Sequence, residues 1–419
     1  MARPASNSSK RRYVTYIGTL GTTHLHLRNP YVIAFWSFVF PGLGHIMLEK
    51  YLMGYLLFLW EVFINLKAHI NLAILYSFTG RFQTAKDVLD INWVLLYFPT
   101  YLFAVWNSYR LTIDLNHQYK LAVREDADIE IFNINTIEIN YLDKKIPWHT
   151  AIWSALMPGL GQLLCHRIPA GIFLAMWFLT IAYLSKLPPA FHYTFLGQFN
   201  FAKSIIDPQW FLNIPSIYFG SIYGAYTSTA TDNRIFDWEQ AKFLKKNYQN
   251  VNFKLPFAKI AGRDERMYIV STFEHSNYLE LAITAIQMKG IAKDNILAIP
   301  LDKRGEQKQL FDTLHSSDGL SLFDLPMILA TMFCIFGSIY GFILTWGPVI
   351  WGIIALFTGF ALGLIIKLIS TKKYTNRQKK QKATEVILII ECQENQLESV
   401  KDTLWNHNAL GVSKLSLDN

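Results

Sequence analysis

Hydrophobic and polar positions along this chain form long alternating blocks. Apolar windows cover residues 93–107, 210–226 and 325–369, and the last window is long enough for two membrane spans. Charged residues collect between these windows instead of being spread evenly. This pattern is typical of helices that cross a lipid bilayer and are joined by polar connections. We therefore expect an α-helical integral membrane protein.

The first two thirds of the chain contain one apolar pattern twice. Residues 30–116 align without a gap with residues 147–233, so each position meets its counterpart 117 positions later. Aligned pairs include Trp36 with Trp153, Gly54 with Gly171, Trp60 with Trp177, Gly80 with Gly197, Trp93 with Trp210, Tyr101 with Tyr218 and Tyr109 with Tyr226. A register kept over this length indicates a duplicated unit, and duplicated membrane bodies place functional surfaces near their pseudo-symmetry axis.

Each copy is expected to hold three apolar helices, near residues 30–48, 51–66 and 93–109 in the first copy and near residues 147–164, 168–184 and 210–226 in the second. A Pro-Gly-Leu-Gly element interrupts the first helix of each copy. Proline lacks an amide hydrogen, and glycine permits a bend or a close approach of helices. We expect this helix to be kinked or re-entrant. The residues singled out as structural kinks are Pro41, Gly42, Gly44, Pro158, Gly159 and Gly161.

An apolar helix that ends in this element and is followed by a second apolar helix resembles a family of small bacterial domains with two transmembrane helices. The resemblance covers the first two helices of each copy. It implies a bacterial membrane protein, and the family lends no general biochemical activity.

Two membrane topologies agree with this order of helices. Three full crossings per copy would invert the second copy relative to the first, whereas a re-entrant first helix would make the copies parallel. Basic residues before residue 30 and after Tyr226 place both of these segments in the cytoplasm under either topology. Six full crossings need no special assumption, so the sequence slightly favours the inverted arrangement.

A second duplication lies in the last third of the chain. Strand-like runs at 268–273 and 296–301 flank a helix that opens at Asn277, and runs at 386–390 and 412–417 flank a helix that opens at Asn395. In both helices a Glu follows the Asn by three residues, so the capping-box pattern predicts Asn277 and Asn395 as N-caps. Two such halves form one four-stranded sheet with two helices on one face, a small α+β domain of the ferredoxin-like type.

An apolar insertion separates the two halves of this domain. Residues 322–369 are expected to form two membrane helices joined at Trp346-Gly347-Pro348, packed closely through glycines four apart, at Gly337 and Gly341 and at Gly359 and Gly363. Both ends of the hairpin must lie on one side of the membrane for the halves to meet, and the basic run after residue 371 makes that side the cytoplasm.

This layout resembles the heat- or low-temperature-induced general stress membrane proteins of bacteria, in which two βαβ halves flank a glycine-rich hairpin. The resemblance extends over residues 267–417 and rests on order and spacing. It implies a small regulatory or interaction domain at the membrane and supplies no catalytic residues.

Composition excludes several other classes. Hydrophobic residues make up 52% of the 419 positions and charged residues 17%, which is far from an ordinary soluble mixture. The net charge is +8, but the basic residues sit beside apolar segments, where they orient helices and contact anionic lipid, so no nucleic-acid partner is expected. The first 28 residues contain no apolar core, so no cleavable secretory signal is expected. Cys165, Cys334 and Cys392 show no pairing pattern and are expected to be reduced.

One pair of charges recurs in both copies. Lys86 and Asp90 in the first copy match Lys203 and Asp207 in the second. Residues four apart share a helix face, so each pair forms either a site for an ion or a headgroup near the bilayer surface or a plain ion pair on an interfacial helix. The sequence favours the plain ion pair.

Two further polar residues are candidates for transport or another function. Glu61 lies at membrane depth in the second helix of the first copy, where an ionisable group is costly, and the second copy has Phe178 there. Glu61 is therefore either a proton or cation ligand or the ion-pair partner of Lys67 near the interface. His45, directly after the Pro-Gly-Leu-Gly element, is the other candidate.

No metal or cofactor is expected, and whether the chain is an enzyme stays open, with the sequence leaning against it. The chain has no phosphate-binding glycine loop, nucleophile elbow or zinc-protease helix. The polar residues that a metal site would need match no known ligand spacing; they are His45, Glu49, His149, Cys165 and His166.

These features divide the chain into segments: 1–29 basic N-terminal tail, 30–116 first membrane repeat, 117–146 polar linker, 147–233 second repeat, 234–266 linker, 267–302 first half of the ferredoxin-like domain, 322–370 transmembrane hairpin and 384–419 second half. The preferred hypothesis is a scaffold or sensor of the bacterial cytoplasmic membrane, with cytoplasmic termini and a role in stress or developmental regulation. The alternative is a channel or transporter for ions or small solutes, and a lipid-modifying enzyme is a weaker third. Expected partners are the lipid bilayer and a protein bound by the cytoplasmic domain, and a homo-oligomer stays open.

Overall fold

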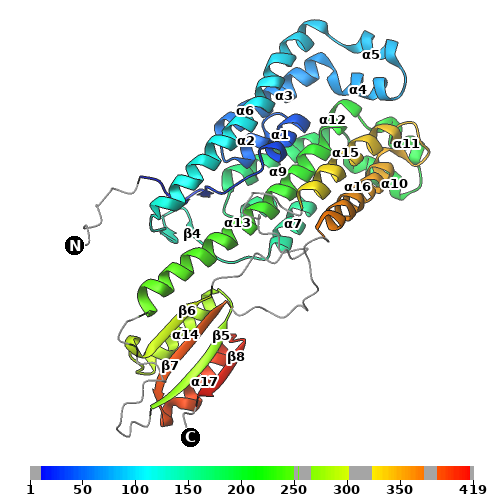
Figure 1. Cartoon of the computed structure of the whole chain (residues 1–419). Coiled ribbons are helices and arrows are strands. Elements are labelled where there is room, and N and C mark those ends of the chain that lie inside the picture. Colours follow the sequence, from blue (N-terminus) through cyan, green and yellow to red (C-terminus); the bar gives the residue numbers. More distant parts are fainter. Residues whose placement is uncertain (1–10, 250–252, 254–265, 302–322, 372–384, 416–419) are drawn as a thin grey trace. The chain divides into compact units, whose positions relative to one another are not determined.

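The computed structural model describes residues 11–249, 253, 266–301, 323–371 and 385–415 (Figure 1). The chain divides into two compact units. The helical unit comprises residues 1–141, 145–231 and 308–375, and the sheet unit comprises residues 142–144, 232–307 and 376–419. The fold is mostly helical with small antiparallel sheets.

The duplication in the sequence is a duplication of helices. The first copy contains α1 (Pro30–Val39), α2 (Leu43–Met47), α3 (Tyr51–Ala68), α4 (Ile70–Phe78), α5 (Phe82–Val88) and α6 (Ile91–Glu125). The second contains α7 (Pro147–Leu156), α8 (Leu160–Leu164), α9 (Ile168–Leu184), α10 (Leu187–Phe195), α11 (Phe199–Ile205), α12 (Pro208–Phe211) and α13 (Ile214–Tyr248). Each helix from α7 to α11 begins 117 positions after its counterpart.

The Pro-Gly-Leu-Gly element breaks the first apolar segment, as predicted. Gly42 and Gly159 have φ angles of 97° and 100°, in the left-handed region that glycine adopts readily. A Cβ added at Gly42 would stand 2.8 Å from the backbone nitrogen of Phe58, and one at Gly159 would stand 2.8 Å from that of Ala175. Only glycine fits here, because the turn lies directly against α3 or α9.

The chain folds back on itself at this break. Arg28 precedes α1 and Glu49 follows α2, yet Arg28 Nη2 lies 3.5 Å from Glu49 Oε1. In the second copy Lys145 Nζ donates to the carbonyl oxygen of Leu164 at 3.0 Å. The segment α1–α2, like α7–α8, is therefore a short hairpin with both ends together. A helix of 10 residues such as α1 rises only about 15 Å, half the thickness of a bilayer core.

The last helix of each copy is longer than the sequence pattern predicted. Helices α6 and α13 each have 35 residues and continue well beyond their apolar parts, into segments expected to be linkers. The sequence explains the extension, since it has neither glycine nor proline between residues 100 and 146 or between residues 225 and 255. The predicted boundaries at Tyr109 and Tyr226 marked the end of hydrophobicity and not of the helix.

The hairpin after the first sheet half consists of α15 (Asp324–Gly341) and α16 (Gly347–Thr371) and belongs to the helical unit (Figure 1). Its glycines lie where the two helices meet, as predicted: a Cβ at Gly359 would stand 2.8 Å from Cβ of Phe333, and one at Gly363 would stand 2.8 Å from the nitrogen of Pro326. The hairpin also packs on the repeats, because Phe323 and Met327 share a buried core with Trp36 and Tyr223.

Several helices have the length and composition of membrane spans. Among the described residues, α3, α15 and the part of α16 up to Ile369 each meet both criteria. Two bent pairs meet them together, α5 with α6 at 90° and α9 with α10 at 61°, which raises the number from 3 to 5.

The sheet unit contains β5 (Arg266–Phe273), α14 (Asn277–Met288), η1 (Lys293–Asn295), β6 (Ile296–Pro300), β7 (Val386–Gln393), η3 (Glu394–Gln396), α17 (Leu397–Asn406) and β8 (Gly411–Leu415). Its four strands follow the order β6-β7-β5-β8, and all neighbours are antiparallel. Strands from before and after the hairpin thus alternate in one sheet. Helices α14 and α17 share its core with Leu244 and Tyr248 of α13.

Both predicted helix caps in this unit are wrong. Ser276, not Asn277, is the N-cap of α14, and its backbone N–H and C=O are bonded by the side chain of Gln240 from α13 at 3.0 and 2.8 Å. The Asn277 side chain donates instead to Asp143 Oδ1 at 2.8 Å. Asn395 lies inside η3, whose capping box is formed by Gln393 and Gln396.

Two small hairpins complete the helical unit. Strands β1 (Thr15–Ile17) and β2 (Thr22–His24) pair within the N-terminal segment that the sequence presented only as a basic tail. Strands β3 (Phe132–Ile134) and β4 (Ile139–Tyr141) pair within the predicted linker between the repeats. A backbone bridge joins Gly21 to Arg167, so the N-terminal hairpin is attached to the start of α9.

Candidate functional site

Buried charges gather where the two repeats and the N-terminal hairpin meet. We call His24, His26, Arg28, Glu49 and Arg167 the charge cluster. The side chains of Arg167, Glu49 and His24 are 5%, 3% and 0% exposed, and that of Arg28 is 12% exposed. Charged groups are almost never buried unless they are paired, so this is the most unusual feature of the helical unit.

Glu49 is the centre of the cluster. Its Oε1 lies 2.8 Å from Arg167 Nη1, 3.5 Å from Arg28 Nη2 and 3.9 Å from His24 Nδ1. Its Oε2 accepts the backbone N–H of His24 at 3.1 Å. One carboxylate is thus shared between two guanidinium groups, Arg28 from just before the first repeat and Arg167 from inside the second.

Histidine and arginine make a second layer of contacts. Arg28 Nε donates to His26 Nε2 at 2.7 Å, so the proton of the neutral imidazole is on Nδ1, which lies 3.0 Å from the carbonyl oxygen of Leu27. The backbone of Arg28 is fixed by Asn116, whose side-chain oxygen accepts its N–H at 2.9 Å and whose amide donates to its C=O at 2.8 Å. Burial lowers the pKa of Arg28 to about 10, although the carboxylate of Glu49 partly offsets this.

The repeat itself brings these charges together. Glu49 and His166 hold the same position in the two copies, directly after the short second helix, with φ angles of 62° and 51°. Left-handed residues of this kind end helices, and the position usually carries glycine. The next position is Lys50 in the first copy and Arg167 in the second, where α3 and α9 begin. The same turn therefore supplies the cluster with Glu49 from the first of these two positions in one copy and with Arg167 from the second position in the other.

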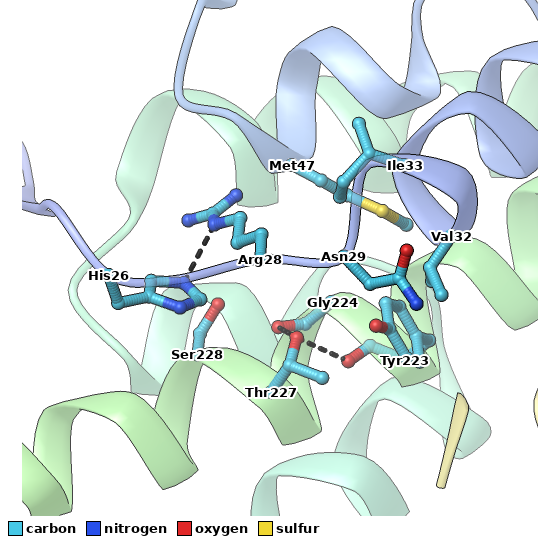
Figure 2. Close-up of a pocket in the computed structure, with 10 residues that line it drawn as sticks. All are labelled: His26, Arg28, Asn29, Val32, Ile33, Met47, Tyr223, Gly224, Thr227 and Ser228. Carbon is cyan, nitrogen blue, oxygen red and sulfur yellow. Dashed lines mark hydrogen bonds between the residues drawn. The ribbon is translucent and has the colours of Figure 1, made fainter. Parts of the chain in front are cut away.

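Small cavities surround the charge cluster. One of about 160 Å³ is bordered by His24, His26, Arg28, Glu49 and Lys50 and by Thr112 and Asn116 of α6. A second, shown in Figure 2, lies between Arg28 and His26 on one side and Tyr223, Thr227 and Ser228 of α13 on the other. A third borders Arg167 and shares Met47, Gly224 and Ser228 with the second.

A separate buried network surrounds Glu61. Asn65 Nδ2 donates to Glu61 Oε1 at 3.0 Å and to Asn71 Oδ1 at 3.2 Å, and Gln209 Nε2 donates to Asn65 Oδ1 at 2.7 Å. Asn71 Nδ2 donates to Asn213 Oδ1 at 3.1 Å. The network thus joins α3 and α4 of the first repeat to the α12 region of the second, and the carboxyl group is bonded by the uncharged side chains of Asn65 and Tyr97.

Of the two alternatives for Glu61, the pairing with Lys67 is wrong, because Glu61 is buried and bonded to Asn65 whereas Lys67 is exposed. The other candidate, His45, is fully buried, and its Nε2 lies 3.1 Å from Asn107 Oδ1. His149 is exposed. These three residues, whose convergence would have pointed to transport or chemistry, therefore lie in three different surroundings.

The repeated Lys and Asp do not share a helix face. Helices α5 and α11 end at Val88 and Ile205, and Asp90 and Asp207 are the N-caps of the next helices. Asp90 Oδ1 accepts the N–H of Asn92 at 3.0 Å, and Asp207 Oδ1 accepts that of Gln209 at 2.9 Å. The predicted geometry was wrong because a helix boundary separates each pair.

The two lysines differ from one another. Lys86 is exposed, whereas Lys203 Nζ donates to the carbonyl oxygen of Leu344 in the turn between α15 and α16 at 3.0 Å. The Asp recurs in both copies because each copy needs a cap at this place. In the second copy the Lys bonds the turn of the α15–α16 hairpin instead.

The charge cluster was missed in the sequence because its members come from separate segments. Arg28 was interpreted only as a topology signal, and Glu49 only as an unmatched metal ligand. One signal was available, since Glu49-Lys50 and His166-Arg167 are charged dipeptides at the same repeat position. Among the described residues no group of three or more His, Cys, Asp or Glu side chains is placed to hold a metal ion. With two guanidinium groups around one carboxylate, the cluster suits an anion.

Comparison of the chain with protein-family models, with curated proteins and with solved structures finds no match.

Proposed function

We propose that this is a multi-pass protein of the bacterial cytoplasmic membrane in which the duplicated helical unit anchors a regulatory or interaction domain. The anchored domain is the sheet unit, which we assign to the ferredoxin-like type, and both termini lie in the cytoplasm. Spans α3, α15 and α16 and the two bent pairs support the membrane location. The scaffold or sensor role and its connection with stress remain part of the proposal.

The order of the strands carries this proposal. The central strand β7 follows the membrane hairpin in the sequence, and its neighbours β5 and β6 both precede it. The sheet therefore forms only when both ends of the hairpin reach the same side of the membrane. Strand β6 precedes α15 and strand β7 follows α16, and these two strands are neighbours in the sheet. A movement of α15 relative to α16 would therefore act on paired strands, as expected of a sensor.

The α1–α2 and α7–α8 hairpins support the parallel topology. If each hairpin enters and leaves on one side, two crossings follow in each copy, and the chain returns to the side from which it started. This reverses the slight preference of the sequence for inverted repeats. Residues 11–28, the linker around Asn135 and the segment after residue 232 then all lie in the cytoplasm.

Cysteine labelling tests the topology. In a cysteine-free variant of the full chain, Asn135→Cys and Arg81→Cys are exposed to a membrane-impermeant maleimide in intact cells and in opened membrane vesicles. We expect Arg81→Cys to react from outside and Asn135→Cys only after opening. Labelling of Asn135→Cys but not of Arg81→Cys in intact cells would restore the inverted arrangement, and equal labelling of both in intact cells would remove the membrane location.

Partner capture tests the regulatory role. In-cell cross-linking and purification are carried out with the intact chain, with Leu388→Asp and with Lys401→Ala. Leu388 is buried in the centre of β7, and Lys401 is exposed on α17. A defined protein recovered with the intact chain and Lys401→Ala but lost with Leu388→Asp supports the role. The same proteins recovered with all three chains, or none with any, contradict it.

Transport is the second candidate, and one observation favours it. The network of Glu61, Asn65, Asn71, Gln209 and Asn213 places polar groups between the two repeats within the apolar helical unit. Flux of ions or small solutes into proteoliposomes that is lost in Glu61→Ala would support it. Absence of any flux with the intact chain would remove it.

A further inference from the structure

One cavity beside the charge cluster is bordered by cationic and donor groups together with the apolar side chains of Leu25, Leu48 and Leu115. Arg28 and Lys50 carry positive charge, and Thr23 and Thr112 bring hydroxyl groups. At about 160 Å³, the cavity is several times the roughly 30 Å³ that one water molecule takes up in the liquid. It has room for a small polar group with several oxygen atoms.

The charges around this cavity favour an anion. Glu49 is its only acidic border residue, and the closest cation to that carboxylate is Arg167, at 2.8 Å. Arg28 is farther from the same oxygen, at 3.5 Å, and Lys50 is exposed at the rim. Among the described border residues two cations therefore face one carboxylate that is already engaged. A buried guanidinium is stabilised by an added anion, and its fork of donors matches phosphate oxygens.

The cavity lies at the level where α6 changes from lipid-like to water-like. On the exposed face of this helix, Phe98, Leu102 and Trp106 are followed by Arg110 and Asp114, which are 63% and 60% exposed. Arg110 also lies over the Trp106 ring at 5.5 Å, an arrangement typical of a membrane interface. Thr112 and Asn116, which border the cavity, belong to this second part of α6.

We propose that this cavity binds a phosphate-type oxyanion, held by the guanidinium of Arg28 and the ammonium of Lys50. The same chemistry is offered by an anionic lipid headgroup and by free phosphate. The headgroup source rests on the proposed membrane location, because it needs the cavity at interface depth. The free-phosphate source does not depend on it.

The test uses the full chain in a maltoside detergent, which contains no phosphate. Inorganic phosphate is titrated against chloride at equal ionic strength, and phosphatidylglycerol is titrated against diacylglycerol, which lacks the phosphate group. The midpoint of thermal unfolding gives the apparent Kd for each ligand. If only inorganic phosphate raises the unfolding midpoint, the ligand is a free anion. If only phosphatidylglycerol raises it, the ligand is a lipid headgroup. If both raise it, the cavity recognises the phosphate group that they share.

Three variants make the test specific. Arg28→Gln is expected to raise the apparent Kd about tenfold or more, because it removes a charge-assisted contact. Lys50→Gln, at an exposed position that tolerates substitution, is expected to raise it about threefold. Arg110→Gln is the matched control, since it removes an exposed cation from the same helix level, and its Kd should be unchanged.

Two results would overturn the proposal. The first is the absence of any rise in the midpoint of the intact chain with either ligand. The second is binding to Lys50→Gln and to a correctly folded Arg28→Gln that equals binding to the intact chain. If Arg28→Gln fails to fold, the result for Lys50→Gln decides whether the proposal holds. An unchanged Kd in Lys50→Gln would show that the ammonium of Lys50 does not bind the anion, which contradicts the proposal. The cysteine-labelling result is independent of these outcomes, so failure of the site and failure of the membrane proposal are distinguishable.

Discussion

The two repeats share their backbone and differ in their buried polar side chains. In both copies the chain turns at a left-handed glycine, folds back beside the following long helix and receives a hydrogen bond from a tyrosine. Tyr101 donates to the carbonyl oxygen of Phe38 at 2.7 Å, and Tyr218 donates to that of Ala155. These bonds satisfy carbonyl groups that the broken helices leave open. The repeated residues are therefore those that build the hairpin.

The polar positions, in contrast, have diverged. His45 corresponds to Gln162, Glu49 to His166, Glu61 to Phe178 and Asn71 to Pro188. Gln162 bonds α13 through the carbonyl oxygen of Ser221 at 2.7 Å, whereas His45 contacts Asn107 of α6. Both copies thus keep the scaffold, and the charge cluster and the buried network around Glu61 lie at positions where the two copies differ.

The largest expected effect is the difference in stability between a variant of Arg167 and the same variant of its counterpart Lys50. Arg167→Met leaves the carboxylate of Glu49 buried without its nearest cation, which should lower the free energy of unfolding by about 3–5 kcal/mol. Lys50→Met removes an exposed charge and should cost less than about 0.5 kcal/mol. Titration with dodecyl sulfate in mixed micelles, followed by tryptophan fluorescence, measures both.

A double variant controls the Arg167 result. Adding Glu49→Gln to Arg167→Met removes the uncompensated charge and should restore most of the lost stability. A loss below about 1 kcal/mol for Arg167→Met alone would mean that the ion pair contributes little, as exposed pairs do. Arg167 and its counterpart Lys50 would then contribute about equally to stability.

The next effect addresses what the copies share. Gly42→Ala forces a left-handed alanine and pushes a Cβ against the backbone of α3, so strain and overpacking together should cost about 3 kcal/mol. Gly80→Ala is the matched control, because Gly80 has a φ of 80° but no atom within 4 Å of an added Cβ. Strain alone should cost about 1 kcal/mol there. The same unfolding titration measures both, and equal losses would show that the close approach to α3 has no energetic weight.

The shared backbone features of the repeats were predictable from the sequence to a greater extent than the buried polar side chains in which the copies differ. The break at the Pro-Gly-Leu-Gly element, the glycine contacts between α15 and α16 and the strands of the sheet unit depend on local residue types, so their positions were predictable, whereas the fold-back of α1 on α2 was left open. Hydrophobicity did not predict the ends of α6 and α13, because a helix continues past its apolar part when no glycine or proline stops it. A second prediction was wrong at Asp90 and Asp207. The spacing of four residues between Lys and Asp suggested one helix, but each Asp is the N-cap of a new helix.

The charge cluster required information that spacing does not contain. His24 and Arg28 come from the N-terminal segment, Glu49 from the first copy and Arg167 from the second, so only tertiary packing brings them together. The Glu61 site was predicted in part, since its position and its asymmetry between copies are visible in the sequence. Its partners Gln209 and Asn213 come from the other copy, where no pattern marks them.

A smaller effect is expected for the buried network around Glu61, which exists on one side of the repeat relation only. Gln209 is buried and bonded to Asn65 and to the backbone N–H of Leu72 at 3.1 Å, whereas its counterpart Asn92 is exposed. Gln209→Ala should therefore cost about 2–3 kcal/mol, because it leaves buried groups without partners. Asn92→Ala should change stability by less than about 0.5 kcal/mol. Unfolding in mixed micelles is again the measurement, and similar losses for both would remove the network as a difference between the copies.

The smallest effect should be the same in both copies. Tyr101→Phe and Tyr218→Phe each delete one hydroxyl that satisfies a carbonyl oxygen at the end of a short helix, at a cost of about 1 kcal/mol. The ring stays in place, so the loss reports on the hydrogen bond. Thermal unfolding midpoints of the two variants, compared with the intact chain, should shift by equal amounts. A shift confined to one copy would show that the hairpins, although equal in backbone, no longer contribute equally to stability.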